Sequence, residues 1–180
     1  MGFFYTGKGD KGTSQIGKKK VPKDSPVIAA LGDLDELNSL IGLVRSDFKN
    51  KKLSQKLQNV QETLFIIQAR VAWIMFSEYE AKQLTGKKVT ELEREIDAIE
   101  EKIKPERGFI ISGSDPMSAQ LDYIRAVSRR VELSINVLHK KYELPQEILS
   151  YMNRLSSYFY ALARNEIYEK NIKEPKPTYE

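Results

Sequence analysis

The sequence has no cysteine and only one histidine among its 180 residues. Without thiols, the chain cannot form disulfides, thiolate metal sites, iron–sulfur clusters or a cysteine nucleophile. A helical di-iron site would need paired Glu-x-x-His motifs, yet Asn136 stands three residues before the single His139. These kinds of site are therefore excluded.

Long apolar runs are also missing. The longest, residues 64–76, is interrupted by Gln68 and Arg70 and is shorter than the roughly 20 apolar residues that span a bilayer. The first residues contain no apolar core of signal-peptide length followed by a small-residue cleavage site. We therefore expect no membrane association and a cytoplasmic location.

The composition that remains is that of a charged globular protein. Hydrophobic residues make up 41% and charged residues 30%, with a formal net charge of +4. This excludes disorder for most of the chain, and the length suits one domain with a single core. The positive charge fits anionic ligands and fits an ordinary lysine-rich surface equally well.

Apolar residues recur at helical spacing from Ala29 onward, without β-alternation of any length. Five stripes joined by short connections predict an all-α, antiparallel five-helix bundle. The stripes are Leu34, Leu37, Ile41 and Val44; Leu53, Leu57, Val60, Leu64, Ile67 and Val71; Val89, Leu92, Ile96, Ile99 and Ile103; Leu121, Ile124, Val127, Val131, Ile135 and Leu138; and Ile148, Met152, Leu155, Phe159 and Leu162.

Local signals set the expected helix ends. Thr90 and Glu93 have capping-box spacing for the third helix, which should stop at Pro105. Asp115 can cap a fourth helix whose first residue is Pro116. We expect a single domain over residues 1–180, with an irregular glycine- and lysine-rich arm over 1–26, a bundle over 27–168 and a tail over 169–180.

The arm contains "TGKGDKGTSQIGKK", which satisfies G-x-G-x-x-G and nearly satisfies a P-loop. Neither motif holds, because no buried strand precedes it and Lys19 replaces the hydroxyl residue that would bind Mg²⁺. The shared chemistry survives, since closely spaced glycines turn backbone amides toward one point and lysines add charge for a polyphosphate. The alternative is a flexible, solvated lysine-rich arm.

Three polar clusters stand beside apolar helix faces. Asp35 and Asn38 share a face in "GDLDELNSLIG", either as a functional pair or as a half-exposed rim. Arg125 and Arg129 lie four residues apart, so two guanidinium groups can grip phosphate while Glu132 orients Arg129. The alternative is a surface ladder of ion pairs.

The third cluster centres on Asn153, which sits between apolar residues of the fifth helix. Asparagine is a poor residue inside a helix, so its amide should have a partner. That partner is either a ligand or a neighbouring helix.

In order along the chain, "YTGKGDKGTS" with "PKDSP", "GDLDELNSLIG", "FIISGS", "RAVSRRVE" and "NRLSSYFYALAR" resemble the PduO-type ATP:cob(I)alamin adenosyltransferases. The resemblance covers residues 5–164. It implies a five-helix bundle that forms a homotrimer, with ATP and corrinoid between subunits. The implied enzyme is an ATP:cob(I)alamin adenosyltransferase that transfers the 5′-deoxyadenosyl group to cobalt and releases triphosphate.

The resemblance also implies roles for individual residues. Asp35 and Arg125 match a salt bridge across the subunit interface, and Phe109 matches the residue that faces the corrinoid and excludes the lower cobalt ligand. Arg129, Asn153 and Phe109 are the implied catalytic residues. The implied ATP-binding set is Thr6, Gly7, Lys8, Gly9, Ser14, Gln15, Lys23, Arg129, Arg130, Glu132 and Asn153.

The implied cofactors and substrates are ATP, Mg²⁺ and cob(I)alamin, with no protein ligand assigned to the metal because ATP phosphates would hold it. Expected partners are a corrinoid reductase and an adenosylcobalamin-dependent enzyme. We expect no binding to nucleic acid or to a membrane. The competing hypothesis is a basic helical protein that binds nucleic acid or acts as a scaffold without catalysis.

Overall fold

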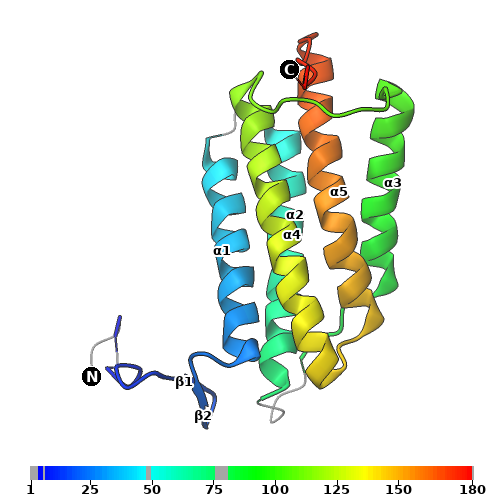
Figure 1. The fold of residues 1–180 in the computed structure, drawn as a ribbon. Helices are drawn as coiled ribbons and strands as arrows, with labels where there is room; N and C mark the ends of the chain where they lie inside the picture. Colours follow the sequence, from blue (N-terminus) through cyan, green and yellow to red (C-terminus); the bar gives the residue numbers. More distant parts are fainter. Residues whose placement is uncertain (1–3, 6, 48–49, 76–80, 180) are drawn as a thin grey trace.

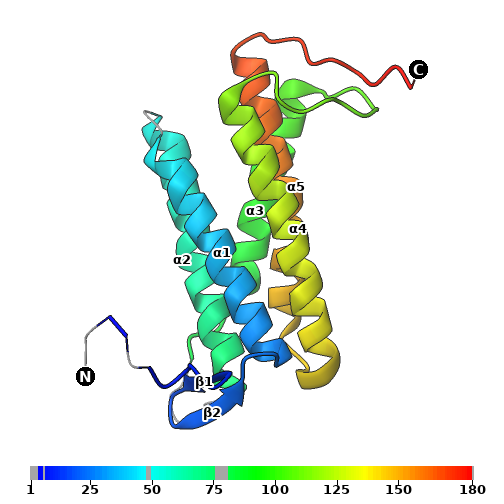
Figure 2. The ribbon, with the colours of Figure 1, turned by 60° about the vertical axis from the view of Figure 1, so that its left-hand side comes forward.

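The structure is a computed structural model that describes residues 4–5, 7–47, 50–75 and 81–179. Five helices lie side by side and a small hairpin lies at the end of the bundle where α1 begins (Figure 1, Figure 2). The expected helical bundle is therefore confirmed. Its elements are β1 (Thr13–Ile16), β2 (Lys19–Pro22), α1 (Pro26–Ser46), α2 (Lys51–Trp73), α3 (Gly86–Ile103), α4 (Pro116–Tyr142) and α5 (Gln146–Glu169).

Helices α1, α2, α4 and α5 surround one core, and α3 packs mainly against α5. Successive helices alternate in direction, so α3 and α5, which are neighbours, run the same way (Figure 1). No helix among the described residues combines the length and apolar character that crossing a bilayer would require.

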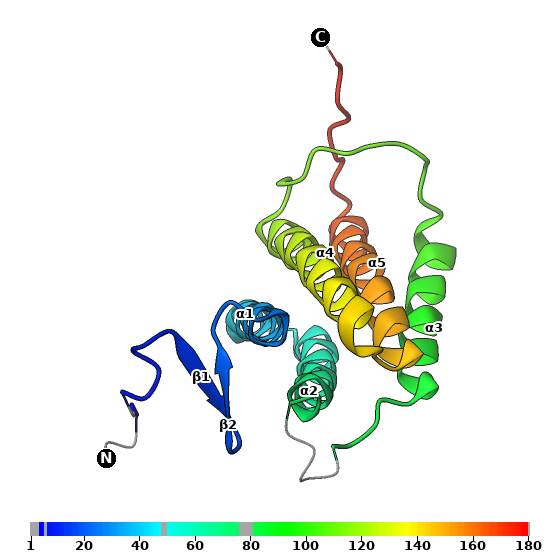
Figure 3. The same cartoon turned by 60° about the horizontal axis from the view of Figure 1, so that its bottom comes forward.

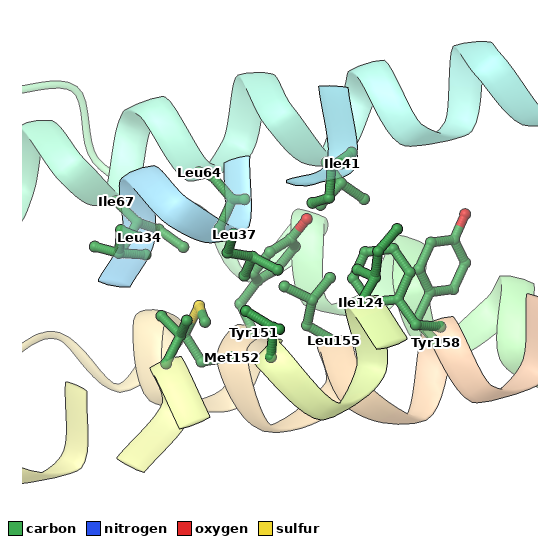
Figure 4. Close-up of a cluster of buried hydrophobic side chains, with 14 of the residues drawn as sticks. Leu34, Leu37, Ile41, Leu64, Ile67, Ile124, Tyr151, Met152, Leu155 and Tyr158 are labelled. Atoms are coloured by element: carbon green, nitrogen blue, oxygen red, sulfur yellow. The ribbon is translucent and has the colours of Figure 1, made fainter. Parts of the chain in front are cut away.

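The core consists of the predicted apolar stripes. Leucine, isoleucine and methionine side chains from α1, α2, α4 and α5 meet in one cluster, which also holds Tyr151 and Tyr158 (Figure 4). The Tyr158 hydroxyl donates to Glu95 Oε2 at 2.8 Å, because a buried hydroxyl needs a partner. Helix α3 contributes one buried residue, Leu92, and is therefore the outermost of the five.

The sequence predicts an irregular arm, but part of the arm is a regular β-hairpin. Residues 13–22 form an antiparallel hairpin in which Ser14 pairs with Val21 and Ile16 with Lys19. Gly17 has a φ of 56° at the first position of the two-residue turn, a conformation that suits glycine. Four-residue strands are too short to show alternation, so the periodicity did not indicate them. The useful signal was a Gly-X turn between two β-capable segments.

The start of α3 was also predicted wrongly. The helix begins at Gly86, and Thr90 lies inside it, where its hydroxyl donates to the Gly86 carbonyl at 3.2 Å. The earlier start brings Val89 into the helix, where it packs against the core. The start of α4 is as expected, because Asp115 accepts from the amides of Met117 and Ser118 at 3.0 and 3.1 Å.

Candidate functional site

The glycine- and lysine-rich arm encloses an open hollow of about 520 Å³, which we call the arm pocket. Five of the seven arm residues assigned to ATP line it, and Gly7 forms the turn beside it. Thr6, the remaining one, lies outside the described residues. The lining residues are Lys8, Gly9, Thr13, Ser14, Gln15, Gly17 and Lys23.

Backbone turns give the arm pocket its shape. Gly7 and Gly12 have φ values of 66° and 76°, a region that L side chains rarely adopt. A Cβ on Gly9 would lie 3.2 Å from the Thr13 carbonyl oxygen and 3.4 Å from Lys23 Nζ. A side chain at position 9 would therefore crowd the Thr13 carbonyl, so glycine suits this close approach. The lining presents ammonium, amide and hydroxyl groups and no carboxylate, which suits an anion.

A second hollow, which we call the arginine groove, lies between α3, α4 and α5 and has a volume of about 480 Å³. Arg125 and Arg129 of α4 line it together with residues of α5, and α3 contributes three isoleucines and the carboxylate of Glu100. Arg125 Nε lies 3.5 Å from Asp122 Oδ1. Arg129 is exposed and makes no hydrogen bond or ion pair within the part of the chain that the structure describes. Its guanidinium group is therefore available to an anionic ligand.

The helix spacing predicts that Glu132 orients Arg129, but the structure does not show this contact. The Glu132 Oε1 atom instead accepts from Asn153 Nδ2 at 2.9 Å, because Glu132 faces α5. The Asn153 Oδ1 atom in turn accepts from Arg154 at 2.8 Å. The expectation of a partner for this amide is confirmed, and the partners are side chains of the bundle. Asn153 is nevertheless exposed, so a ligand can reach it.

Arg130 and Asp35 differ in their partners. Arg130 pairs with Glu36 of α1, and the hydrogen bond and charge of Glu36 raise the pKa of the guanidinium above its ordinary value. Asp35 is exposed, and Arg125 pairs with Asp122 rather than with Asp35 in the described chain. The described chain therefore does not pair Asp35 with Arg125.

Phe109 lies in the connection between α3 and α4, and 77% of its surface is exposed. It lines a third hollow of about 480 Å³, which we call the Phe109 hollow. Tyr160 and Arg164 of α5 line both this hollow and the arginine groove, so the two are adjacent. Neither residue was picked out from the sequence, where both look like ordinary members of "YFYALAR". The spacing of four between them was the signal available.

The structure brings some of the predicted residues together and separates others. Arg129 and Arg125 share the arginine groove, next to the Phe109 hollow. The arm pocket shares no lining residue with either, and the hairpin lies beyond α1, on the side away from α3 (Figure 3). One chain thus carries two separate parts of the expected nucleotide site. Among the described residues, no three histidine, aspartate or glutamate side chains are grouped to hold a metal ion.

Comparison with known proteins finds similar chains among the corrinoid adenosyltransferases. Corrinoid adenosyltransferase of Bacillus subtilis (strain 168) is 34% identical over 165 residues, which cover 89% of this chain and 84% of that protein. Corrinoid adenosyltransferase PduO of Citrobacter freundii is 34% identical over 167 residues, and the chain spans about half of its length, 49%.

A solved structure and a family model extend the comparison to the fold. A variant of the PduO-type ATP:corrinoid adenosyltransferase from Lactobacillus reuteri, complexed with cobalamin and ATP, superimposes with a TM-score of 0.90 at 30% identity. The match covers 97% of this chain and 99% of that one. The model of the cobalamin adenosyltransferase family matches residues 4–166. This chain therefore belongs to the cobalamin adenosyltransferase family.

Proposed function

We propose that this protein transfers the 5′-deoxyadenosyl group of ATP to the cobalt of cob(I)alamin, giving adenosylcobalamin and triphosphate. The observation that carries the proposal is the pairing of an anion-suited arm pocket with an arginine groove in a chain of this family. Family membership gives no support to the competing hypothesis of a nucleic-acid-binding or scaffold protein.

The chemistry asks the protein for positioning and charge rather than for a nucleophile. Co(I) supplies the electron pair that forms the cobalt–carbon bond at C5′, the C5′–oxygen bond breaks, and triphosphate leaves with that bond's electrons. The protein must hold the reacting atoms in line and stabilise the leaving group. Cobalt is formally oxidised from Co(I) to Co(III) because it donates both electrons of the new bond. Triphosphate takes both electrons of the broken bond, so no external oxidant is needed.

We assign the triphosphate to the arm pocket and to the arginine groove. Lys8, Lys23 and the turned backbone amides would bind its oxygens, and Arg129 would add a bidentate contact. Asn153, Glu132 and Arg130 would complete the site from α4 and α5. Mg²⁺, when bound, neutralises phosphate charge, and we propose that ATP oxygens hold it because no carboxylate lines the arm pocket.

We assign the corrinoid to the Phe109 hollow. The exposed phenyl ring of Phe109 is apolar and offers no ligand atom, so it can occupy the lower face of the corrinoid without coordinating cobalt. Loss of the lower ligand eases reduction of Co(II), because that ligand stabilises the higher oxidation state. Phe109 would thus favour the Co(I) state that the reaction needs.

We also propose that the active assembly is a homotrimer with each site shared by two subunits. The separation of the arm pocket from the arginine groove supports this, since one chain does not bring them together. Asp35 of one subunit would pair with the Arg125 of the next. A reductase that supplies the electron and an enzyme that uses adenosylcobalamin would be its partners, in the cytoplasm.

The test is an absorbance assay with the purified protein, Mg·ATP and chemically reduced cob(I)alamin. We expect adenosylcobalamin and triphosphate in equal amounts. Arg129→Ala should lower kcat by about 100-fold or more, the usual loss when one donor to a developing negative charge is removed. The matched control is Arg94→Ala, an exposed arginine of α3 outside these hollows, which should keep the wild-type rate. No conversion by the wild-type protein would refute the proposal.

A further inference from the structure

The C-terminal tail leaves α5 in a defined direction. The Ile172 amide donates to the Ile167 carbonyl and the Asn171 amide to the Tyr168 carbonyl, both at 3.0 Å. Asn171 has a φ of 53°. These are the bonds of a Schellman motif with asparagine in the left-handed position, which ends the helix and fixes the path of the chain that follows.

The tail then reaches a buried arginine. Arg164 of α5 is 7% exposed and forms ion pairs with Asp122 of α4 and with Glu174 of the tail. It also donates to Ser118 Oγ at 3.1 Å. The Glu174 side chain is 12% exposed, so this is a largely buried contact rather than a surface pair. Breaking such a contact leaves buried positive charge only partly compensated, which is costly.

Charge balance makes Glu174 necessary to this cluster. Arg125 and Arg164 both pair with Asp122, so without the tail two positive groups share one negative group. Glu174 brings the four side chains to neutrality. Arg164 Nε is already without a hydrogen-bond partner among the described residues, so losing Glu174 would leave more of the guanidinium unsatisfied.

Beyond Glu174, the tail contacts the connection that carries Phe109. The Ile111 amide donates to the Pro175 carbonyl at 2.8 Å, and Lys176 Nζ lies 2.7 Å from Glu106 Oε2. The two segments run alongside each other at the end of the bundle (Figure 2). The Arg164 guanidinium also lies over the Tyr160 ring, 5.0 Å from its centroid, and both residues line the Phe109 hollow.

We infer that Glu174 and Arg164 are positioning residues: they anchor the tail so that it holds the Phe109 connection in place over the corrinoid side of the site. The identity of the ligand as a corrinoid rests on the proposed function, whereas the anchoring of the tail is a property of the chain itself. Phe109 is 77% exposed, so little packing of its own side chain holds it in place. The tail supplies a backbone hydrogen bond two residues away.

The test compares Glu174→Gln and a chain ending at Lys173 with the wild-type protein. We expect hydrogen exchange at the Ile111 amide, measured by NMR without ligands, to accelerate by about tenfold or more in the shortened chain. The KM for the corrinoid should rise by about tenfold while the KM for ATP stays within about twofold. The absorbance signature of bound four-coordinate cob(II)alamin should weaken in parallel.

Two controls separate this effect from general destabilisation. A chain ending at Pro177 keeps Glu174, Pro175 and Lys176 and should behave as the wild type. Glu101→Gln removes an exposed carboxylate at the end of α3 and should change none of these quantities.

Unchanged exchange at Ile111 in the chain ending at Lys173 would overturn the inference, and so would equal increases in both KM values. If no adenosyl transfer occurs at all, the proposed function fails, and the exchange measurement alone then decides whether the tail anchors the connection.

Discussion

The carboxylate of Asp115 serves two partners at once. It caps α4 through two backbone amides, and its Oδ1 lies 2.7 Å from Lys170 Nζ just beyond the end of α5. Burial alone would raise the pKa of this carboxyl, but the Lys170 hydrogen bond, the two amides and the Lys170 charge together hold the pKa below its ordinary value. The ionised form is therefore favoured in the folded protein.

At this residue scale we predict a pH-dependent contribution to stability. A carboxyl whose pKa is lower in the folded state stabilises it above the unfolded pKa of about 3.9, and this contribution is lost as pH falls through the folded pKa. Asp115→Asn keeps a capping oxygen and removes the charge. Its melting temperature, followed by circular dichroism, should lie below that of the wild type at pH 7, and the gap should narrow below about pH 4.

The matched control is Asp97→Asn on the exposed face of α3, which should show no such gap. If the melting temperatures of Asp115→Asn and the wild type differ by the same amount at every pH down to pH 2, the charge of Asp115 makes no specific contribution to stability.

Among the elements, the β1–β2 hairpin links the arm pocket to the bundle. Val21 is 2% exposed, and Ile16 packs against the core, while Ser14 and Gln15 of the same hairpin line the arm pocket. Burial of Val21 and Ile16 therefore fixes the positions of Ser14 and Gln15, which we assign to phosphate binding. Burial of a valine is worth about 1.5–3 kcal/mol, enough to decide whether so small a hairpin stays docked.

We predict that Val21→Ser weakens ATP binding without unfolding the bundle. The Kd for ATP, measured by calorimetry, should rise by about tenfold, the equivalent of about 1.4 kcal/mol. The melting temperature should change by only a few degrees because the hairpin contributes little to the core. Lys20→Ser, at the exposed neighbouring position, is the control. If ATP binds equally well to Val21→Ser, the docking of the hairpin does not shape the pocket.

The elements also show what the sequence could predict. The apolar stripes identified all five helices, because packing of an amphipathic face dominates helix formation. The capping box at Thr90 misled, because α3 already begins at Gly86 and includes Val89, which packs partly buried against the core. Within the candidate site, local patterns indicated the arm, Arg129 and Asn153, whose roles remain predictions. The sequence patterns did not identify Arg164 or Glu174, because their roles depend on a contact between α5 and the tail that no periodicity encodes.

At the scale of the whole molecule, the separation of the arm pocket from the arginine groove predicts complementation between subunits. Lys23→Ala damages the arm pocket and Arg129→Ala damages the arginine groove, so each variant alone should form an inactive homotrimer. A ring built from both variants contains one interface at which an intact arm meets an intact Arg129, on the order of one third of its sites. Only a shared site makes this recovery possible.

The experiment is to produce the two variants together, each with its own affinity tag, and to purify assemblies that carry both tags. About one third of wild-type adenosyl transfer should return in these assemblies. Separately assembled trimers mixed without subunit exchange should stay inactive, which controls for trace wild-type protein. If doubly tagged assemblies have no activity while each variant keeps its native size, then both parts must act within one chain. The arm would then have to move around α1 to reach Arg129, and the proposal of a shared site would be wrong.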